Sequence, residues 1–219
     1  MNCKLDIVCE TGLQFFGKMS SSNFHEIKNA LAIINENAGL LEDFSNMTSE
    51  GRIIDSERLM VLARKIMKQV RRTDEIVRNI NRFSHSVDDF VKRVDVGETV
   101  GFVATISERF AVMRGVVLEP KHPETQVRII TSPFFLENLI WLCLDFAMNA
   151  AGDGKTVGLI TEETESGARV RFTRLDALGE SSENMFPTER EEALIKVLGA
   201  YLTVNTEAGE IILGLAKTI

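Results

Sequence analysis

The chain has few of the residues that would mark a secreted or metal-bound protein. Its 219 residues include three cysteines, Cys3, Cys9 and Cys143, which are odd in number and lack the spacing of a metal site. A disulfide framework is therefore not expected, and a reducing compartment suits this composition. The opening stretch MNCKLDIVCE contains acidic residues and no continuous apolar core, so it does not predict a signal peptide.

Long apolar runs and an excess of cations are also missing. The richest apolar stretch, FFLENLIWLCLDFAMNAA, is interrupted by Glu137 and Asp145, which makes it too short and too polar to span a bilayer. The formal net charge is −7, from 25 Lys and Arg against 32 Asp and Glu, whereas nucleic-acid binding depends on clustered cations. We therefore expect a cytoplasmic protein that binds neither membrane nor nucleic acid.

Two helical patterns make up the first part of the chain. Apolar residues recur at steps of three and four over residues 23–44, and Asn23 with Glu26 three places later predicts a capped helix start. The polar stretch SNMTSEGRIID interrupts the pattern, which resumes over residues 56–90. These features predict a helical hairpin domain, residues 1–92. One hairpin cannot bury both of its apolar stripes, so we expect a homodimer with a four-helix bundle.

Helices and strands alternate in the rest of the chain. VDVGETVGFVATISERFAVM predicts a helix, VVLEPKHPETQVRIITS two short strands around a turn, and the stretch from Pro133 to Gly152 a buried helix. A strand hairpin (TVGLITEE, ARVRFTRL), a helix (TEREEALIKVLGAYL) and a closing hairpin (LTVNTEAGEIILGLA) follow. This order predicts an α/β sandwich over residues 93–219, so the whole chain is expected to belong to the α+β class.

The stretch NFHEIKNALAII holds the strongest candidate site. His25 is adjacent to the apolar stripe but outside it, so its imidazole should face outward. Glu26 can hold or deprotonate a ring nitrogen and so provide the neutral imidazole that a nucleophile needs. Lys28 and Asn29, one helical turn away, can steady an incoming phosphoryl group. These residues predict a histidine that accepts a phosphoryl group and passes it on.

FHEIKNALAII resembles the H-box of sensor histidine kinases, with Ala30 where that family commonly has proline. The order of NINRFSHSVDDF, VDVGETV and ENLIWLCLDFAMNAA also resembles the family layout. The resemblance implies that His25 is phosphorylated and that Glu26 is its acid/base neighbour. It also implies that Asn29 positions water or phosphate during transfer and dephosphorylation.

The same resemblance implies a second site, for Mg-ATP, whose pattern is incomplete here. The helix LDFAMNAA keeps Asn149 at the magnesium position, with Asp145 one turn earlier where the family often has asparagine. The adenine turn corresponds to LDALGE, in which Asp176 and Gly179 match and Leu178 replaces the first glycine. ESSENMFPTERE is a shortened lid, and no glycine-rich turn precedes EALIKVLGAYL. Because glycines let backbone amides approach phosphates, their loss predicts a vestigial ATP site.

Several other features are weaker candidates. Asn149 is either a magnesium ligand or only a helix residue that caps a buried position. AGDGKTVG contains Gly-Lys-Thr, the tail of a phosphate-binding P-loop, but Asn149 stands where that motif requires its first glycine. We therefore expect this segment to be a helix stop and a turn into the next strand. His85 has two acids nearby, Asp88 and Asp89, yet lacks the Glu-x-x-Asn context. His122 is expected to be plain surface, and no metal site is predicted.

An intact H-box beside an eroded ATP site resembles the kinase-like histidine phosphotransferases of two-component phosphorelays. The resemblance implies a shuttle between receiver-domain aspartates through His25, with a response-regulator receiver as the partner. The receiver would supply magnesium, and no cofactor of the chain's own is expected. Phosphohistidine and phosphoaspartate are both high-energy species, so transfer needs mainly positioning. Two alternatives remain open: a soluble histidine kinase with an atypical ATP site, and a non-catalytic docking partner of a response regulator.

Overall fold

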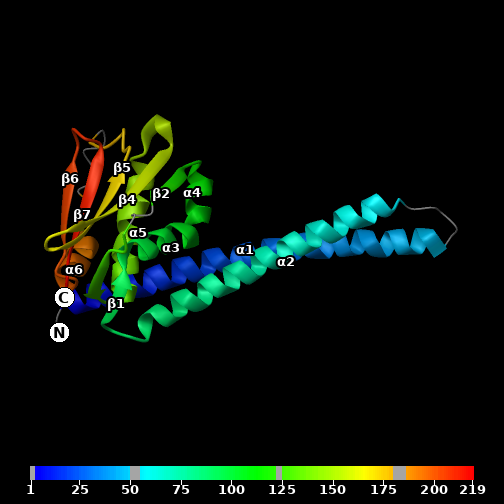
Figure 1. The fold of residues 1–219 in the computed structure, drawn as a ribbon, viewed down its shortest axis with the longest axis horizontal. Coiled ribbons are helices and arrows are strands. Elements are labelled where there is room, and N and C mark those ends of the chain that lie inside the picture. The colour runs from blue at the N-terminus through cyan, green and yellow to red at the C-terminus, as the bar shows by residue number, and fades with distance from the viewer. Residues whose placement is uncertain (1–2, 50–54, 122–124, 180–185) are drawn as a thin grey trace. The chain divides into compact units, whose positions relative to one another are not determined.

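The computed structural model describes residues 3–49, 55–121, 125–179 and 186–219 (Figure 1). The chain packs into two units, one formed by Met1–Met19 with His85–Ile219 and the other by Ser20–Ser84. The start of the described chain, up to Met19, thus packs with the C-terminal part, an association that the sequence pattern did not indicate.

The unit Ser20–Ser84 is a helical hairpin. Its helices belong to α1 (Cys3–Ser49) and α2 (Ser56–Ser84), which run side by side in Figure 1. The predicted helix start at Asn23 is wrong, because α1 already begins at Cys3 and extends through this position. A helix continues cheaply once it is formed, and nothing in residues 3–23 breaks it. The predicted end near residue 90 is also wrong, because the chain tightens into the 3₁₀ turn η1 (His85–Val87) after α2.

Each helix of the hairpin buries a stripe at alternating steps of three and four residues. On α1 the stripe consists of Asn23, Ile27, Ala30, Ile34, Asn37, Leu41 and Phe44, all buried or half-buried. On α2 it consists of Leu62, Ile66, Gln69, Thr73, Ile76, Ile80 and Phe83. This spacing is that of helices in a left-handed bundle. Within the stripe, the buried Asn37 is satisfied locally, since its Nδ2 donates to the Ile33 carbonyl at 2.6 Å.

A mixed five-stranded sheet forms the core of the other unit. Its strand order is β2 (Val117–Lys121), β4 (Thr156–Thr164), β5 (Gly167–Thr173), β7 (Glu210–Ala216) and β6 (Tyr201–Asn205). Strand β2 is parallel to β4, and the remaining pairs are antiparallel. The two predicted strand hairpins, β4–β5 and β6–β7, are confirmed, and so is the α+β class.

The two strands expected on either side of a proline-containing turn do form, but they lie in different sheets. Strand β2 is at the edge of the main sheet, whereas β3 (Arg128–Thr131) pairs with β1 (Lys92–Asp95) in a separate two-stranded sheet. The single helix predicted after residue 93 is divided into β1, α3 (Val96–Ile106) and α4 (Glu108–Arg114). Asp95 marks the division, because its Oδ1 accepts the Glu98 amide and so begins α3.

Helices pack against the main sheet and bury its apolar side. Helix α5 (Pro133–Asn149) is buried along most of its length and contains Trp141 and Cys143, while α3 packs beside it. Helix α6 (Glu189–Val197) begins at a capping box formed by Thr188 and Glu191. It ends before Gly199 (φ +55°), so the chain turns into β6 earlier than predicted. Among the described helices, none has the length and apolarity needed to cross a membrane.

Candidate functional site

His25 lies in the middle of α1 and its side chain is exposed, as its position outside the apolar stripe predicted. Lys28 and Asn29 are also exposed, one turn further along the same helix. Residues three and four apart on a helix share a face, so these side chains project from the same surface as the imidazole. Ala30, where the resemblance would place a proline, is buried within the uninterrupted helix.

Glu26 is half-buried and contacts the second helix of the hairpin. Its Oε2 accepts a hydrogen bond from Nη2 of Arg72 on α2 at 3.1 Å, with side chains 24% and 55% exposed respectively. The sequence predicted that Glu26 would hold the ring of His25. In the structure the carboxylate of Glu26 instead forms an ion pair with Arg72 on α2. Sequence reasoning missed Arg72, although an arginine next to the stripe position Thr73 was a usable signal.

The side chains around His25 therefore bring two cationic groups to this part of the hairpin, those of Lys28 and Arg72. A guanidinium presents planar donors that suit a phosphoryl oxygen, and an ammonium acts as a flexible point charge. His25, Lys28 and Asn29 are exposed, so these groups are accessible to a macromolecule as well as to a small molecule.

The positions of the vestigial ATP site lie in the other unit. Asn149 is exposed at the end of α5. Asp145, one turn earlier, is half-buried and its Oδ1 accepts a hydrogen bond from Nη2 of Arg114 at 2.7 Å. Asp176 lies in the turn after β5 and packs against the glycine turn that follows α5, since a Cβ on Gly154 would lie 3.0 Å from its Oδ2.

Asn149 borders two hollows next to α5. The larger, about 500 Å³, is lined by one cation, Arg190, and by the carboxylates of Asp145, Glu189, Glu191 and Glu192. The smaller, about 200 Å³, is lined in part by Leu178 and Gly179. The ring of Phe186, stacked on Phe146 with centroids 4.1 Å apart, borders both. A triphosphate is bound by cations and open backbone amides, so a lining rich in carboxylates is a poor fit for the phosphates of ATP.

The weaker sequence candidates occupy separate places. The GDGK segment forms a 3₁₀ turn (Gly152–Gly154) and a left-handed Lys155 (φ +44°) that lead from α5 into β4, as a turn reading predicted. His85 lies in η1, with Nδ1 2.6 Å from Oδ2 of Asp88. His122 lies outside the described residues. Within those residues, no three His, Cys, Asp or Glu side chains gather closely enough to hold a metal ion.

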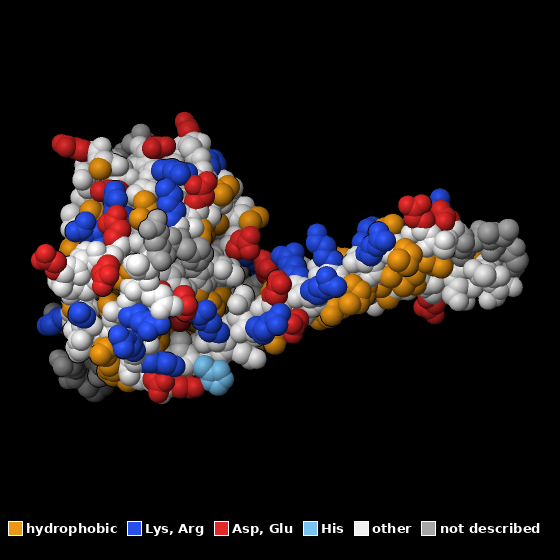
Figure 2. Space-filling model, in the orientation of Figure 1, with side chains coloured by type: hydrophobic (Ala, Val, Ile, Leu, Met, Phe, Trp, Pro, Cys, Tyr) orange, Lys and Arg blue, Asp and Glu red, His pale blue; other side chains and the backbone are white. Residues whose placement is uncertain are grey.

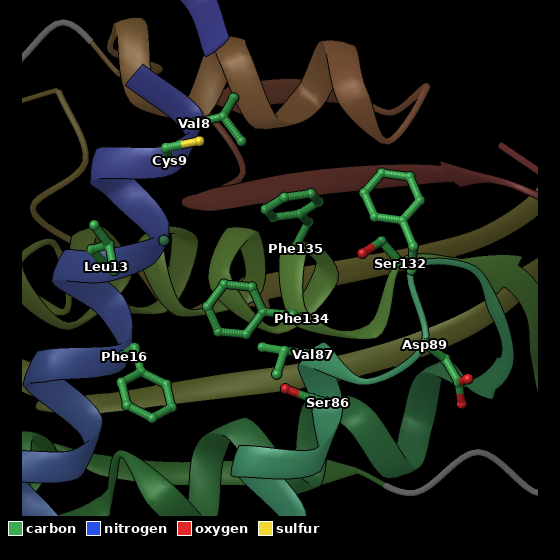
Figure 3. Close-up of a pocket in the computed structure, with 12 residues that line it drawn as sticks. Val8, Cys9, Leu13, Phe16, Ser86, Val87, Asp89, Ser132, Phe134 and Phe135 are labelled. Atoms are coloured by element: carbon green, nitrogen blue, oxygen red, sulfur yellow. The ribbon is translucent and has the colours of Figure 1, made fainter. Parts of the chain in front are cut away.

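An apolar groove of about 500 Å³ lies between the start of α1, η1 and the start of α5 (Figure 3). Its lining residues are Val8, Cys9, Gly12, Leu13, Phe16, Ser86, Val87, Asp89, Phe90, Ser132, Phe134 and Phe135. In Figure 3, Ser86 and Asp89 lie on η1 and the segment that follows it, Ser132 lies at the start of α5, and the rings of Phe134 and Phe135 lie between α1 and these residues. The sequence did not predict this groove, because it depends on the packing of residues 1–19 with the later part of the chain.

Comparison with known proteins gives no match to any family model and no match to a curated protein. Several solved structures are similar in fold. The Acinetobacter baumannii histidine kinase AdeS is 13% identical, with a TM-score of 0.47 over 88% of this chain and 98% of that one. The ATP-binding domain of PrrB from Mycobacterium tuberculosis is 15% identical, with a TM-score of 0.48 over 59% of this chain and 98% of that one.

A third similar structure is the histidine kinase ThkA in complex with the response regulator protein TrrA. It is 18% identical, with a TM-score of 0.45 over 94% of this chain and 63% of that one. At these identities the likeness concerns the fold alone.

Proposed function

We propose that this chain is a histidine phosphotransferase that carries a phosphoryl group on His25 between aspartates of response-regulator receiver domains. The observation that carries the proposal is the exposed imidazole of His25 in the middle of α1, with Lys28 and Asn29 exposed on the next turn. A protein-bound acyl phosphate can reach a nucleophile only on an open surface, and this face of the hairpin provides one. A shuttle of this kind would act in the cytoplasm.

The transfer step needs few groups beyond the histidine. A ring nitrogen of His25 attacks the phosphorus of an aspartyl phosphate, the N–P bond forms, the acyl P–O bond breaks, and the carboxylate leaves with the receiver. Magnesium held by the receiver, together with Lys28 and Arg72, would offset charge on the phosphoryl oxygens. Glu26 remains the proposed acid/base neighbour, and its pairing with Arg72 fixes where its carboxylate lies.

The carboxylates beside α5 favour a shuttle over a kinase. Asp145 is paired with Arg114, and Glu189, Glu191 and Glu192 line the larger hollow beside Asn149. We therefore propose that the chain receives its phosphoryl group from a receiver and not from ATP. A soluble histidine kinase remains the competing function, since Asn149 and Gly179 border the same small hollow.

We also propose that the hairpin pairs with a second copy. Apolar side chains gather along the hairpin in Figure 2. Phe24 and Leu31 on α1 are 60% and 52% exposed, and Val70 and Val77 on α2 are 44% and 41% exposed. Each pair is seven residues apart, so each forms a stripe along one side of its helix. Covering these stripes with another hairpin produces a four-helix bundle.

The dimer is tested by light scattering during gel filtration of wild type, Leu31→Glu and Leu40→Glu. Both leucines are exposed on α1, at 52% and 41%, but they are nine residues apart and so lie on opposite sides of the helix. We expect a dimer for wild type and Leu40→Glu and a monomer for Leu31→Glu. A monomeric wild type, or a dimeric Leu31→Glu, would contradict the interface.

The phosphotransferase is tested by mixing the protein with a ³²P-labelled receiver domain and mapping the label by peptide. We expect acid-labile, base-stable label on the His25 peptide of wild type and of His122→Gln, the matched histidine control, and none at position 25 of His25→Gln. A wild-type His25 peptide without label would overturn the proposal. If γ-³²P-ATP labels wild type but not His25→Gln, the chain is a kinase. Receiver binding without any label would make it a docking partner.

A further inference from the structure

We infer that His85 is a second phosphoryl acceptor, which reacts through Nε2 with small acyl phosphates and phosphoramidates. His85 lies in η1, immediately after α2, and its side chain is 76% exposed. Its Nδ1 lies 2.6 Å from Oδ2 of Asp88. The inference goes beyond the proposed function, which uses His25 alone.

The contact with Asp88 selects one form of the ring. A carboxylate only accepts hydrogen bonds, so Nδ1 carries a proton, and in the neutral ring the free lone pair is then on Nε2. Because the side chain is exposed, that lone pair is open to a reagent in solution. At His25 the adjacent carboxylate, Glu26, is bound to Arg72. The carboxylate–imidazole arrangement that the sequence predicted for His25 is thus present at His85.

The turn that carries His85 is held in place. The amide of Asp88 donates to the His85 carbonyl at 3.3 Å, which closes the turn with a second contact between the same two residues. Ser86 is buried and Val87 lines the apolar groove (Figure 3), so this side of the turn packs against the protein. The imidazole of His85 is exposed. A ring held in one orientation loses less freedom on reaction than a mobile one.

The charges near His85 also tolerate a phosphoryl group. Asp89, the second acid of this segment, lies 3.4 Å from the ammonium of Lys92. This pair offsets one of the two negative charges next to the imidazole. The other, on Asp88, faces the protonated nitrogen and stabilises the positive charge that develops on the ring.

The proposed step is balanced without any further reactant. With phosphoramidate, the Nε2 lone pair attacks phosphorus, the Nε2–P bond forms, the P–N bond of the reagent breaks and ammonia leaves. The ring keeps its Nδ1 proton and becomes cationic beside Asp88. With an acyl phosphate, the acyl P–O bond breaks instead and a carboxylate leaves.

The test is a time course of phosphoramidate labelling of the His25→Gln full chain at pH 8, read by peptide mass spectrometry. This variant retains two histidines, His85 and His122, and His122 serves as the reference. We expect His85 to be labelled at least about tenfold faster than His122, and phosphorus NMR to place the phosphorus on Nε2. In the His25→Gln background, Asp88→Asn should reduce the His85 rate to that of His122. Asp89→Asn, which removes the neighbouring carboxylate, should leave it unchanged.

Equal labelling of His85 and His122 would overturn the inference, and so would an Asp88→Asn variant that reacts as fast as its parent. Phosphorus on Nδ1 would also overturn it, because Asp88 is expected to block that atom. None of these results bears on transfer from a receiver to His25, so the two proposals fail separately.

Discussion

Nη2 of Arg72 lies 3.1 Å from Oε2 of Glu26, and this ion pair joins the two helices of the hairpin one residue away from His25. The glutamate of the H-box-like stretch is thereby tied to α2, 46 residues further along the chain. The position of the carboxylate next to His25 thus depends on the packing of the hairpin as well as on the local sequence.

Arg72→Met should affect phosphoryl transfer far more than stability. The pair is partly exposed, so its contribution to the free energy of unfolding should be below about 1 kcal/mol. A misplaced acid/base neighbour should reduce the rate of His25 labelling by a phosphorylated receiver at least about tenfold. A double-mutant cycle with Glu26→Gln, measured by urea unfolding and by transfer rate, checks both numbers.

The matched control for Arg72→Met is Arg71→Met, which removes an exposed arginine one position away on α2. It should change neither the transfer rate nor the free energy of unfolding. Equal loss of transfer in the two variants would show that only the net charge of α2 matters.

Gly17→Ala and Gly12→Ala should change the free energy of unfolding by different amounts, although both glycines lie within α1. An alanine at Gly17 would meet nothing within 4 Å, so it should raise the free energy of unfolding by about 0.5–1 kcal/mol through the higher helix propensity of alanine. At Gly12 the new Cβ would lie 3.1 Å from Cε1 of Phe134, and the displaced ring should cancel that gain. Urea unfolding measures both, and equal stabilisation would contradict the close packing of α1 on α5.

Cys143 should make the protein less stable at alkaline pH. Burial raises the pKa of its thiol well above the usual range, and the negative charge of Glu191 adds to the effect. The unfolded thiol ionises near pH 8.5 while the folded thiol stays protonated, so the unfolded state gains stability as pH rises. Above that pH the free energy of unfolding should fall by up to about 1.4 kcal/mol per pH unit.

Urea unfolding between pH 7.5 and 9.5 checks this pH dependence, with Cys143→Ala as the comparison. The alanine variant should show a flatter slope, and an identical slope would contradict the assignment. In the folded wild type, a thiol reagent should modify the exposed Cys9 and leave the buried Cys143 intact.

Arg171→Leu should destabilise the main sheet. Nε and Nη2 of Arg171 both donate to Oε2 of Glu210, at 2.9 and 2.7 Å, and this carboxylate side chain is only 10% exposed. Removing the cation leaves a nearly buried charge without its partner, which should cost about 2 kcal/mol in the free energy of unfolding. Arg169→Leu, on the same strand but 3.8 Å from the more exposed Glu162, should cost less than about 1 kcal/mol. An equal decrease in the free energy of unfolding of Arg171→Leu and Arg169→Leu, measured by urea unfolding, would contradict the role assigned to Glu210.

Much of the fold was predictable because the signals are local. The steps of three and four residues identified both helices of the hairpin, and alternation identified the strand pairs β4–β5 and β6–β7, whose partners are near in sequence. The boundaries failed where local signals competed. Asn23 with Glu26 predicted a capped helix start, yet α1 continues through Asn23, because a formed helix is extended more easily than it is interrupted.

Sequence by itself determined the composition of the candidate site, since His25, Lys28 and Asn29 share a helical face through spacing alone. The tertiary structure decided which groups those residues meet. Glu26 forms an ion pair with Arg72, and β3 pairs with β1. Asn149 lines a hollow together with carboxylates from α5 and α6. Such contacts join residues far apart in the chain, and they depend on how whole elements pack. Spacing along one segment carries no information about which distant side chain completes a pair.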